Sequence, residues 1–197
     1  MGLSKILLAG TTIAALASIG VAHAQAPVNG VCPGIGTLGS ATDCNVEIFY
    51  GAGGTASTIT PNMTPYDGSD DNLVGIINNS GAPITTLTFT GSSFAGGLFA
   101  FDGDGLQTYG VGLGSDPTGY GGKTSLGQFT TFTGINASET TGTVVFGASG
   151  IPNGGTAYFS LEGPPSAFVR TPEPATLAIM GVGLLGLGLV SRRRKNG

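Results

Sequence analysis

The stretch Thr86-Leu87-Thr88-Phe89-Thr90 alternates hydroxyl and apolar side chains without interruption. Successive side chains of a β-strand point to opposite faces, so this order makes one face apolar and the other face polar. In a helix the same side chains would be spread around the axis. The stretch is therefore typical of a strand that covers a core on one face and leaves the other face to solvent.

Similar runs of β-branched and aromatic residues recur between clusters of Gly, Asn, Asp and Pro. We expect strands at 46–50, 73–78, 84–90, 98–101, 128–132, 143–146 and 156–161. Between 107 and 126 the pattern gives way to glycine, which predicts a long and mobile loop. The predicted fold class is all-β: an antiparallel β-sandwich of immunoglobulin-like or jelly-roll type, flanked by a cleaved signal peptide and a C-terminal transmembrane helix.

The N-terminus has the order of a secretory signal peptide. Lys5 precedes an apolar stretch from 6 to 21, and Ala22-His23-Ala24 provides the small residues of an A-x-A site. No stop-transfer charges follow Ala24, which argues against the alternative of an uncleaved anchor. We expect signal peptidase to remove residues 1–24 from an exported domain spanning 25–171.

The C-terminus combines Pro172-Glu173-Pro174, an uncharged stretch from 175 to 190, and the basic residues Arg192, Arg193, Arg194 and Lys195. Sixteen residues form a helix of about 24 Å, shorter than the roughly 30 Å hydrocarbon core of a bilayer. The cations hold the last residues in the cytoplasm, so the domain lies outside. The two prolines keep the preceding peptide extended and accessible to a protease.

This order of proline box, short span and basic end resembles the PEP-CTERM sorting signal, which here covers 172–197. The resemblance implies transient membrane anchoring and removal of the tail by an exosortase, a membrane-embedded cysteine protease. It also implies an inner-membrane precursor in a Gram-negative bacterium, and a product at the cell surface or in the extracellular matrix. The alternative of an ordinary tail anchor shares the span and the charges but requires no PEP box.

The charge of the predicted domain is acidic and sparse. Outside the two signals Lys123 and Arg170 are the only cations, against ten acids. A surface so poor in Lys and Arg does not neutralise phosphates, which excludes nucleic acid as a partner.

The two cysteines, Cys32 and Cys44, lie near the predicted mature N-terminus. Because exported proteins pass through an oxidising compartment, we expect a disulfide between them. A zinc site needs further ligands, and the single histidine, His23, leaves with the signal peptide.

The residue inventory of the mature domain argues against catalysis. Without histidine or an unpaired cysteine it lacks a serine triad with a His base, a Cys-His protease site and most zinc hydrolase sites. A glycosidase-type carboxylate pair and a Ser-Lys dyad using Lys123 stay open as alternatives. We expect a protein that is not an enzyme.

Acidic residues cluster in two segments, 66–72 and 101–105. Carboxylates at alternating positions beside glycine suit a hard cation, and both segments together predict one calcium site. Asp-Gly pairs also form ordinary turns between strands, and neither segment completes an EF-hand loop. The candidate ligands are Asp67, Asp70, Asp71, Asp102 and Asp104.

The body also resembles uncharacterised β-rich domains of other PEP-CTERM proteins, through the segments 66–75, 101–105 and 158–162. That family context implies exopolysaccharide production and biofilm formation. We therefore expect a structural or adhesive component that contacts extracellular polysaccharide. Two alternatives remain: a secreted carbohydrate-active hydrolase that uses a carboxylate pair, and a calcium-dependent binding module.

Overall fold

The computed structural model describes residues 26, 28–34, 43–52, 56–60, 64–92, 96–112, 114 and 116–170. The predicted signal peptide, 1–24, and the predicted sorting segment, 172–197, lie outside these residues. No helix within the described part of the chain is long and apolar enough to cross a membrane.

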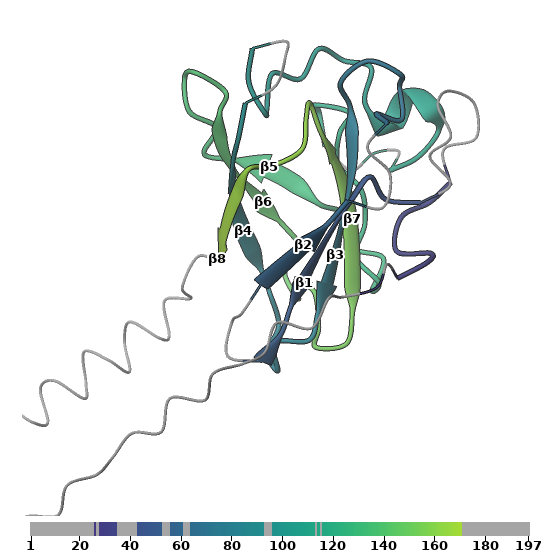
Figure 1. Cartoon of the computed structure of the whole chain (residues 1–197), viewed down its shortest axis with the longest axis vertical. Helices are drawn as coiled ribbons and strands as arrows, with labels where there is room; N and C mark the ends of the chain where they lie inside the picture. Colours follow the sequence, from purple (N-terminus) through teal and green to yellow (C-terminus); the bar gives the residue numbers. More distant parts are fainter. Residues whose placement is uncertain are drawn as a thin grey trace, which may run out of the picture.

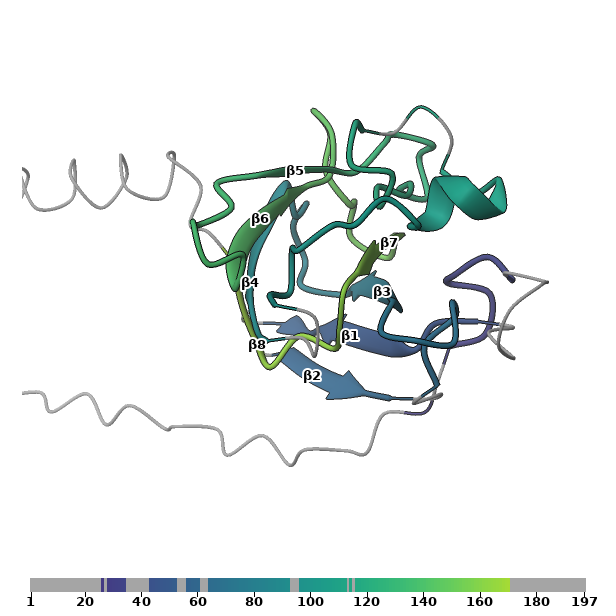
Figure 2. The ribbon, with the colours of Figure 1, turned by 90° about the horizontal axis from the view of Figure 1, so that it is seen from above.

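Two four-stranded sheets face each other and form the domain (Figures 1 and 2). The first sheet has the order β2 (Ala56–Ile59), β1 (Val46–Tyr50), β3 (Asn72–Asn78), β7 (Thr156–Leu161). The second has the order β5 (Thr131–Thr133), β6 (Thr141–Val145), β4 (Thr86–Thr90), β8 (Ala167–Arg170). The prediction of a β-rich fold with two sheets is confirmed.

The prediction that all strands are antiparallel is wrong for the centre of the first sheet. There β1 and β3 run parallel, with Val46 opposite Val74 and Tyr50 opposite Asn78. β1 and β2 form an antiparallel pair at one edge, and the chain then returns to the other side of β1. β3 therefore starts at the same end as β1. The sequence did not indicate this parallel pair, because strand direction depends on the path of the connection.

Most of the predicted strands are found. Two have the predicted bounds, β1 and β7, and the expected alternation of 86–90 appears in β4 as exposed or half-buried threonines between buried Leu87 and Phe89. The strand expected at 98–101 is wrong: Leu98 and Phe99 lie in a turn and are buried there. Sequence reasoning missed β2, made of exposed residues, and β8.

The core lies between the two sheets. Alternate residues of β1, β3 and β7 on one side meet Leu87, Phe89 and Val144 on the other. Edge-to-face aromatic contacts connect the sheets, such as Phe89 to Phe159 with ring centroids 5.4 Å apart. Burial of this apolar surface is the main force that holds the sandwich together.

The first sheet is covered on its outer face as well. β1 and β3 are buried at every position. A second cluster of buried residues lies there, formed by Phe49, Leu73 and Ile77 with the disulfide and the 3-10 helix η2 (Leu106–Tyr109). In Figure 2 η2 lies on the side of β3 and β7 that faces away from the second sheet. Burial on both faces explains why β3 reads as a continuous apolar run.

The segment expected to be a mobile loop, 107–126, is folded against the sheet in its described part. Its amides and carbonyls bond to β7 and neighbouring turns, as in Tyr158 N to Lys123 O at 3.0 Å. Tyr120 is among the largest fully buried side chains. The glycines between these anchors allow the backbone to lie close to the sheet, which composition alone did not indicate.

Candidate functional site

The two acidic segments predicted to act together do meet. Carboxylate oxygens of Asp67, Asp71 and Asp104 lie within 4.8 Å of one another. Asp67 and Asp71 belong to the turn that leads into β3, and Asp104 directly precedes the turn into η2. We call these three residues the acidic cluster.

Asp67 shapes the turn that carries two members of the acidic cluster. Its Oδ1 atom accepts hydrogen bonds from the backbone amides of Ser69, at 3.1 Å, and Asp71, at 3.0 Å. This is the local side-chain to backbone bonding for which aspartate is favoured in turns. The carboxylate of Asp67 is half-buried, and its bond to the amide of Asp71 holds the two residues close together.

Asp71 is the buried member of the cluster, with only 1% of its surface exposed. Its Oδ2 atom accepts a hydrogen bond of 2.8 Å from the hydroxyl of Tyr66. Ser160 of β7 contacts the same hydroxyl at 2.9 Å and so ties the turn to the sheet. The other oxygen of Asp71, Oδ1, is buried and has no hydrogen-bond partner. An unpaired buried oxygen of this kind is costly unless something neutralises it.

Asp104 is positioned by Tyr120. The Tyr120 hydroxyl lies 2.9 Å from Asp104 Oδ1 and 3.0 Å from Asp102 Oδ1 and donates to this pair. Gly105 makes the approach of the ring possible, because an added Cβ at that position would lie 2.6 Å from the ring of Tyr120. Phe101 packs on the same ring, with centroids 4.4 Å apart.

Glu162 is a buried acid near the cluster that sequence reasoning missed. It follows β7, is only 1% exposed, and accepts a hydrogen bond of 3.3 Å from the backbone amide of Asp102. Burial, followed by the nearby charges of Asp102 and Asp70, raises the pKa of Glu162 to about 7. The available signal was a lone glutamate at the end of a strand in which almost every other residue is apolar or small.

The electrostatic surroundings of these carboxyls are uniformly negative. Burial, followed by the charges of Glu162, Asp104 and Asp67, raises the pKa of Asp71 to about 8. The interaction of Asp104 with Asp102 raises the pKa of Asp104 and lowers that of Asp102. The neighbouring charges that raise these pKa values belong to other acids.

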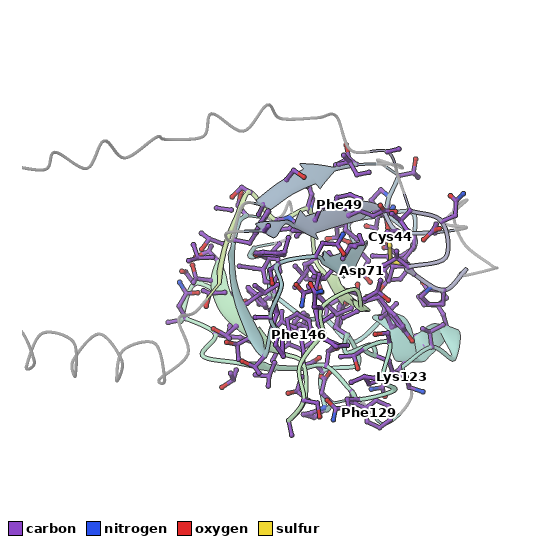
Figure 3. All side chains as sticks on the ribbon, turned by 90° about the horizontal axis from the view of Figure 1, so that it is seen from below. Cys44, Phe49, Asp71, Lys123, Phe129 and Phe146 are labelled. Carbon is purple, nitrogen blue, oxygen red and sulfur yellow. A yellow bond between two sulfur atoms is a disulfide. The ribbon has the colours of Figure 1, made fainter. Side chains whose placement is uncertain are left out.

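Lys123, the cation whose side chain the structure describes, lies away from the acidic cluster. Lys123 stands over the ring of Phe129, with Nζ 5.2 Å from the centroid. Figure 3 shows this pair at the edge of the domain, away from Asp71. Arg170 is the last residue of β8, in the second sheet. Lys123 therefore supplies no positive charge to the acidic cluster.

The structure divides the five predicted calcium ligands. It brings Asp67, Asp71 and Asp104 together. Asp102 and Asp70 are neighbours outside the converging set: Asp102 accepts hydrogen bonds from Tyr120 and from the amide of Asp104. Whether an ion binds stays a prediction at this point.

The disulfide predicted from the sequence is confirmed. Cys32 and Cys44 are joined, with Cα atoms 5.1 Å apart. The bridge packs over β3, where Gly75 leaves room for it: an added Cβ at Gly75 would lie 2.4 Å from Cys44 Sγ. Asp43, beside the bridge, accepts three backbone hydrogen bonds, from Gly30, Cys32 and Cys44.

The raised pKa values of Asp71 and Glu162 would suit a carboxylate pair of the glycosidase type. Both side chains are closed off, however, with 1% of their surface exposed. A general acid must come within hydrogen-bond reach of the bond it protonates. The arrangement therefore favours binding of something as small as an ion over attack on a glycan.

Comparison with known proteins gives one finding. Residues 170–195 match the family model of the PEP-CTERM protein-sorting motif. No curated protein and no solved structure matches the chain. The motif supports an exported protein that an exosortase processes, and it confirms the resemblance seen in the C-terminal sequence.

Proposed function

We propose that this chain, which carries a PEP-CTERM protein-sorting motif, is a structural or adhesive component of the cell envelope and its extracellular polysaccharide, without enzymatic activity. Export delivers the sandwich domain to the outer side of the inner membrane, where the C-terminal span anchors it transiently. Exosortase then removes the tail and releases the domain to the cell surface or the matrix.

The sorting motif carries this proposal, and its position in the fold supports it. The matched segment begins at Arg170, the last residue of β8. β8 is an edge strand, hydrogen-bonded to β4 with Leu87 opposite Arg170. Cleavage near Pro174 would therefore leave every described strand on the released product. The matched segment overlaps the described strands only at Arg170.

The described domain supports a binding or structural role more than a catalytic one. The acids with the most strongly raised pKa values, Asp71 and Glu162, are enclosed. The chain as a whole is acidic, with a pI of about 4.6 and no Trp, the residue that often lines sugar-cleaving clefts. An acidic surface of this kind favours solubility outside the cell.

Intact-mass analysis of the protein released by the producing cells tests sorting. We expect a product that begins after Ala24 and ends near Pro174. Replacing Pro172 and Pro174 with alanine should leave unprocessed precursor in the membrane, because the helix then extends back into the recognition peptide. The matched control replaces Pro164 and Pro165, which lie before β8 and outside the motif, and should be processed normally. Released protein that retains Arg192 to Arg194 would contradict the proposal.

A second measurement tests the role in the matrix. The released protein is mixed with polysaccharide from the same cells, and both sedimentation and reducing sugar are followed. Saturable co-sedimentation without turnover is the expected result. Release of reducing sugar would instead support the hydrolase, and the absence of both would remove the matrix role while leaving the sorting result intact.

A further inference from the structure

We propose that Asp67, Asp71 and Asp104 form a binding site for one calcium ion, which joins the turn before β3 to the turn before η2. This inference concerns the folded domain and stands independently of the proposed matrix role.

The three carboxylates converge from separate parts of the chain. Asp104 is more than thirty residues from Asp71 in the sequence, yet their carboxylate oxygens and those of Asp67 lie within 4.8 Å. An aspartate that only accepts hydrogen bonds from the backbone of its own turn does not need carboxylates of another segment beside it. Asp102 shows the contrast, since it accepts the amide of Asp104 two residues on, at 3.3 Å.

One oxygen of Asp71 is buried without a hydrogen-bond partner. Among the described residues, nearly all buried side-chain polar atoms are hydrogen-bonded, and Asp71 Oδ1 is an exception. The carboxylate is 1% exposed, so bulk water does not solvate it. Its other oxygen is held by Tyr66. One oxygen of this buried carboxylate is held by a hydrogen bond, and the other has no partner. The second oxygen can therefore act as a ligand to a cation.

The carboxylates around Asp71 carry charges of the same sign. Asp67, Asp104 and Glu162 all act on Asp71 with the same sign, and the side chain of Lys123 lies over Phe129 instead. Like charges held this closely repel one another in a poorly solvated site. A divalent cation bound between the carboxylates would attract each of them and so offset their mutual repulsion.

The hydroxyls around the cluster support ligands rather than compete with them. Tyr66 and Tyr120 are both fully buried and donate to Asp71 and Asp104. Burial and the neighbouring carboxylates raise the pKa of both phenols, so they stay protonated donors. Such outer partners hold metal ligands in a fixed orientation.

The ligand chemistry indicates calcium. All donors are oxygens, which excludes the softer metals that prefer sulfur or imidazole. Calcium accepts about six to eight oxygens in flexible geometry. The three carboxylates of the acidic cluster therefore leave coordination positions for backbone carbonyls and water. Magnesium demands near-octahedral geometry and gives up its waters reluctantly. Exported modules meet calcium at concentrations of about 10⁻⁴ to 10⁻³ M, where sites of this kind work.

The test uses the protein recovered from the producing cells, with calcium as the probe. Equilibrium dialysis should find one calcium per chain, and thermal melts at matched ionic strength should show a rise in Tm as calcium passes its Kd. Asp104→Asn should weaken calcium binding by roughly tenfold or more, comparable to the loss of a metal-supporting group. The matched control is Asp70→Asn, in the same turn as Asp67 but outside the converging set, and it should keep the calcium-dependent rise.

Three results would overturn the proposal. One is the absence of calcium in dialysis of the unaltered protein, which needs no variant to fold. Another is a rise in Tm that magnesium or added sodium reproduces equally. The third is equal loss of the calcium response in Asp70→Asn and Asp104→Asn, which would indicate general electrostatics instead of a site. None of these outcomes depends on tail processing or on polysaccharide binding.

Discussion

Asp43 and Asp71 are two aspartates that each precede a central strand of the first sheet, and they are satisfied in opposite ways. Asp43, ahead of β1, accepts three backbone amides, at 2.5, 3.1 and 2.9 Å. Asp71, ahead of β3, accepts one tyrosine hydroxyl and leaves Oδ1 without a partner. The same residue type at equivalent places thus has two different roles.

The difference shows how to separate a structural acid from a candidate ligand. Backbone amides are part of the fold and fill the oxygens of Asp43 permanently, which stabilises the turn around the disulfide. Asp71 depends on Tyr66 and is surrounded by other acids, so its charge has no protein partner. Asp43 also lies close enough to Cys32 and Cys44 for the three to hold a metal, but both of those sulfurs are joined in the disulfide.

The largest effect we expect is on the pH dependence of stability with calcium removed. Asp71 and Glu162 have pKa values of about 8 and about 7 in the folded state, above their values of 3.8 and 4.5 as free groups. The folded state therefore binds more protons than the unfolded state, and stability falls as pH rises from about 4 to about 8. At about 1.4 kcal/mol per pKa unit, the fall from the two groups together is on the order of 9 kcal/mol.

Denaturant unfolding across this pH range with chelator measures that effect. Calcium should make the fall smaller. Asp71→Asn should remove much of the slope, whereas Asp43→Asn should leave it in place. A slope that is equally reduced in both variants would break the distinction between the two aspartates.

The next largest effect concerns the disulfide beside Asp43. Replacing Cys32 and Cys44 together with alanine should lower the free energy of unfolding by about 3 kcal/mol, because the unfolded chain loses a short loop constraint. We expect the sandwich to persist, since the bridge closes only the N-terminal segment. Unfolding curves with and without calcium should show the same loss. A loss that appears only with calcium would mean that the two regions are coupled.

A smaller effect is expected for Asp43→Asn. The amide keeps the shape of the side chain but places a donor against one of the three backbone amides, which should cost about 2 kcal/mol. The cost should be the same in calcium and in chelator, because Asp43 lies outside the acidic cluster. Chemical unfolding measures it, and a calcium-dependent cost would assign Asp43 a role in ion binding.

The smallest effect we expect is for Tyr66→Phe. This change removes the hydroxyl that donates to Asp71 and contacts Ser160, at a cost of about 1 kcal/mol in chelator. Calcium affinity should also fall, because Asp71 loses its orienting partner. Tyr158→Phe is the matched control, since no hydrogen bond of its hydroxyl is found among the described contacts. Equal calcium affinity in the two variants would limit Tyr66 to a packing role.

Much of the fold was predictable because its signals are local. The alternation of 86–90 reports one buried face, and β1 and β7 follow from runs of β-branched and aromatic residues between turn formers. β2 was missed because its residues, Ala56–Ile59, are small or polar and exposed at an edge. Leu98 and Phe99 were read as a strand because burial in a turn leaves the same apolar signal as burial in a sheet.

The candidate site was predictable only as a set of acids. The sequence showed that two short segments hold half of the domain's acids. It did not show that Asp104 joins Asp67 and Asp71 while Asp70 and Asp102 stay outside. It also missed Glu162, which has no acidic neighbour in the sequence and reaches the site from the end of β7.

The sorting motif, the disulfide pair and the β-rich class could be predicted without a structure, because each depends on residue order, compartment or a local period. Tertiary structure alone decided the parallel pairing of β1 and β3, the burial of Tyr120 in a glycine-rich segment and the choice of three acids from five. These features depend on which distant segments share a face of the sheet. That is set by packing of the whole chain, and no local pattern of residues encodes it.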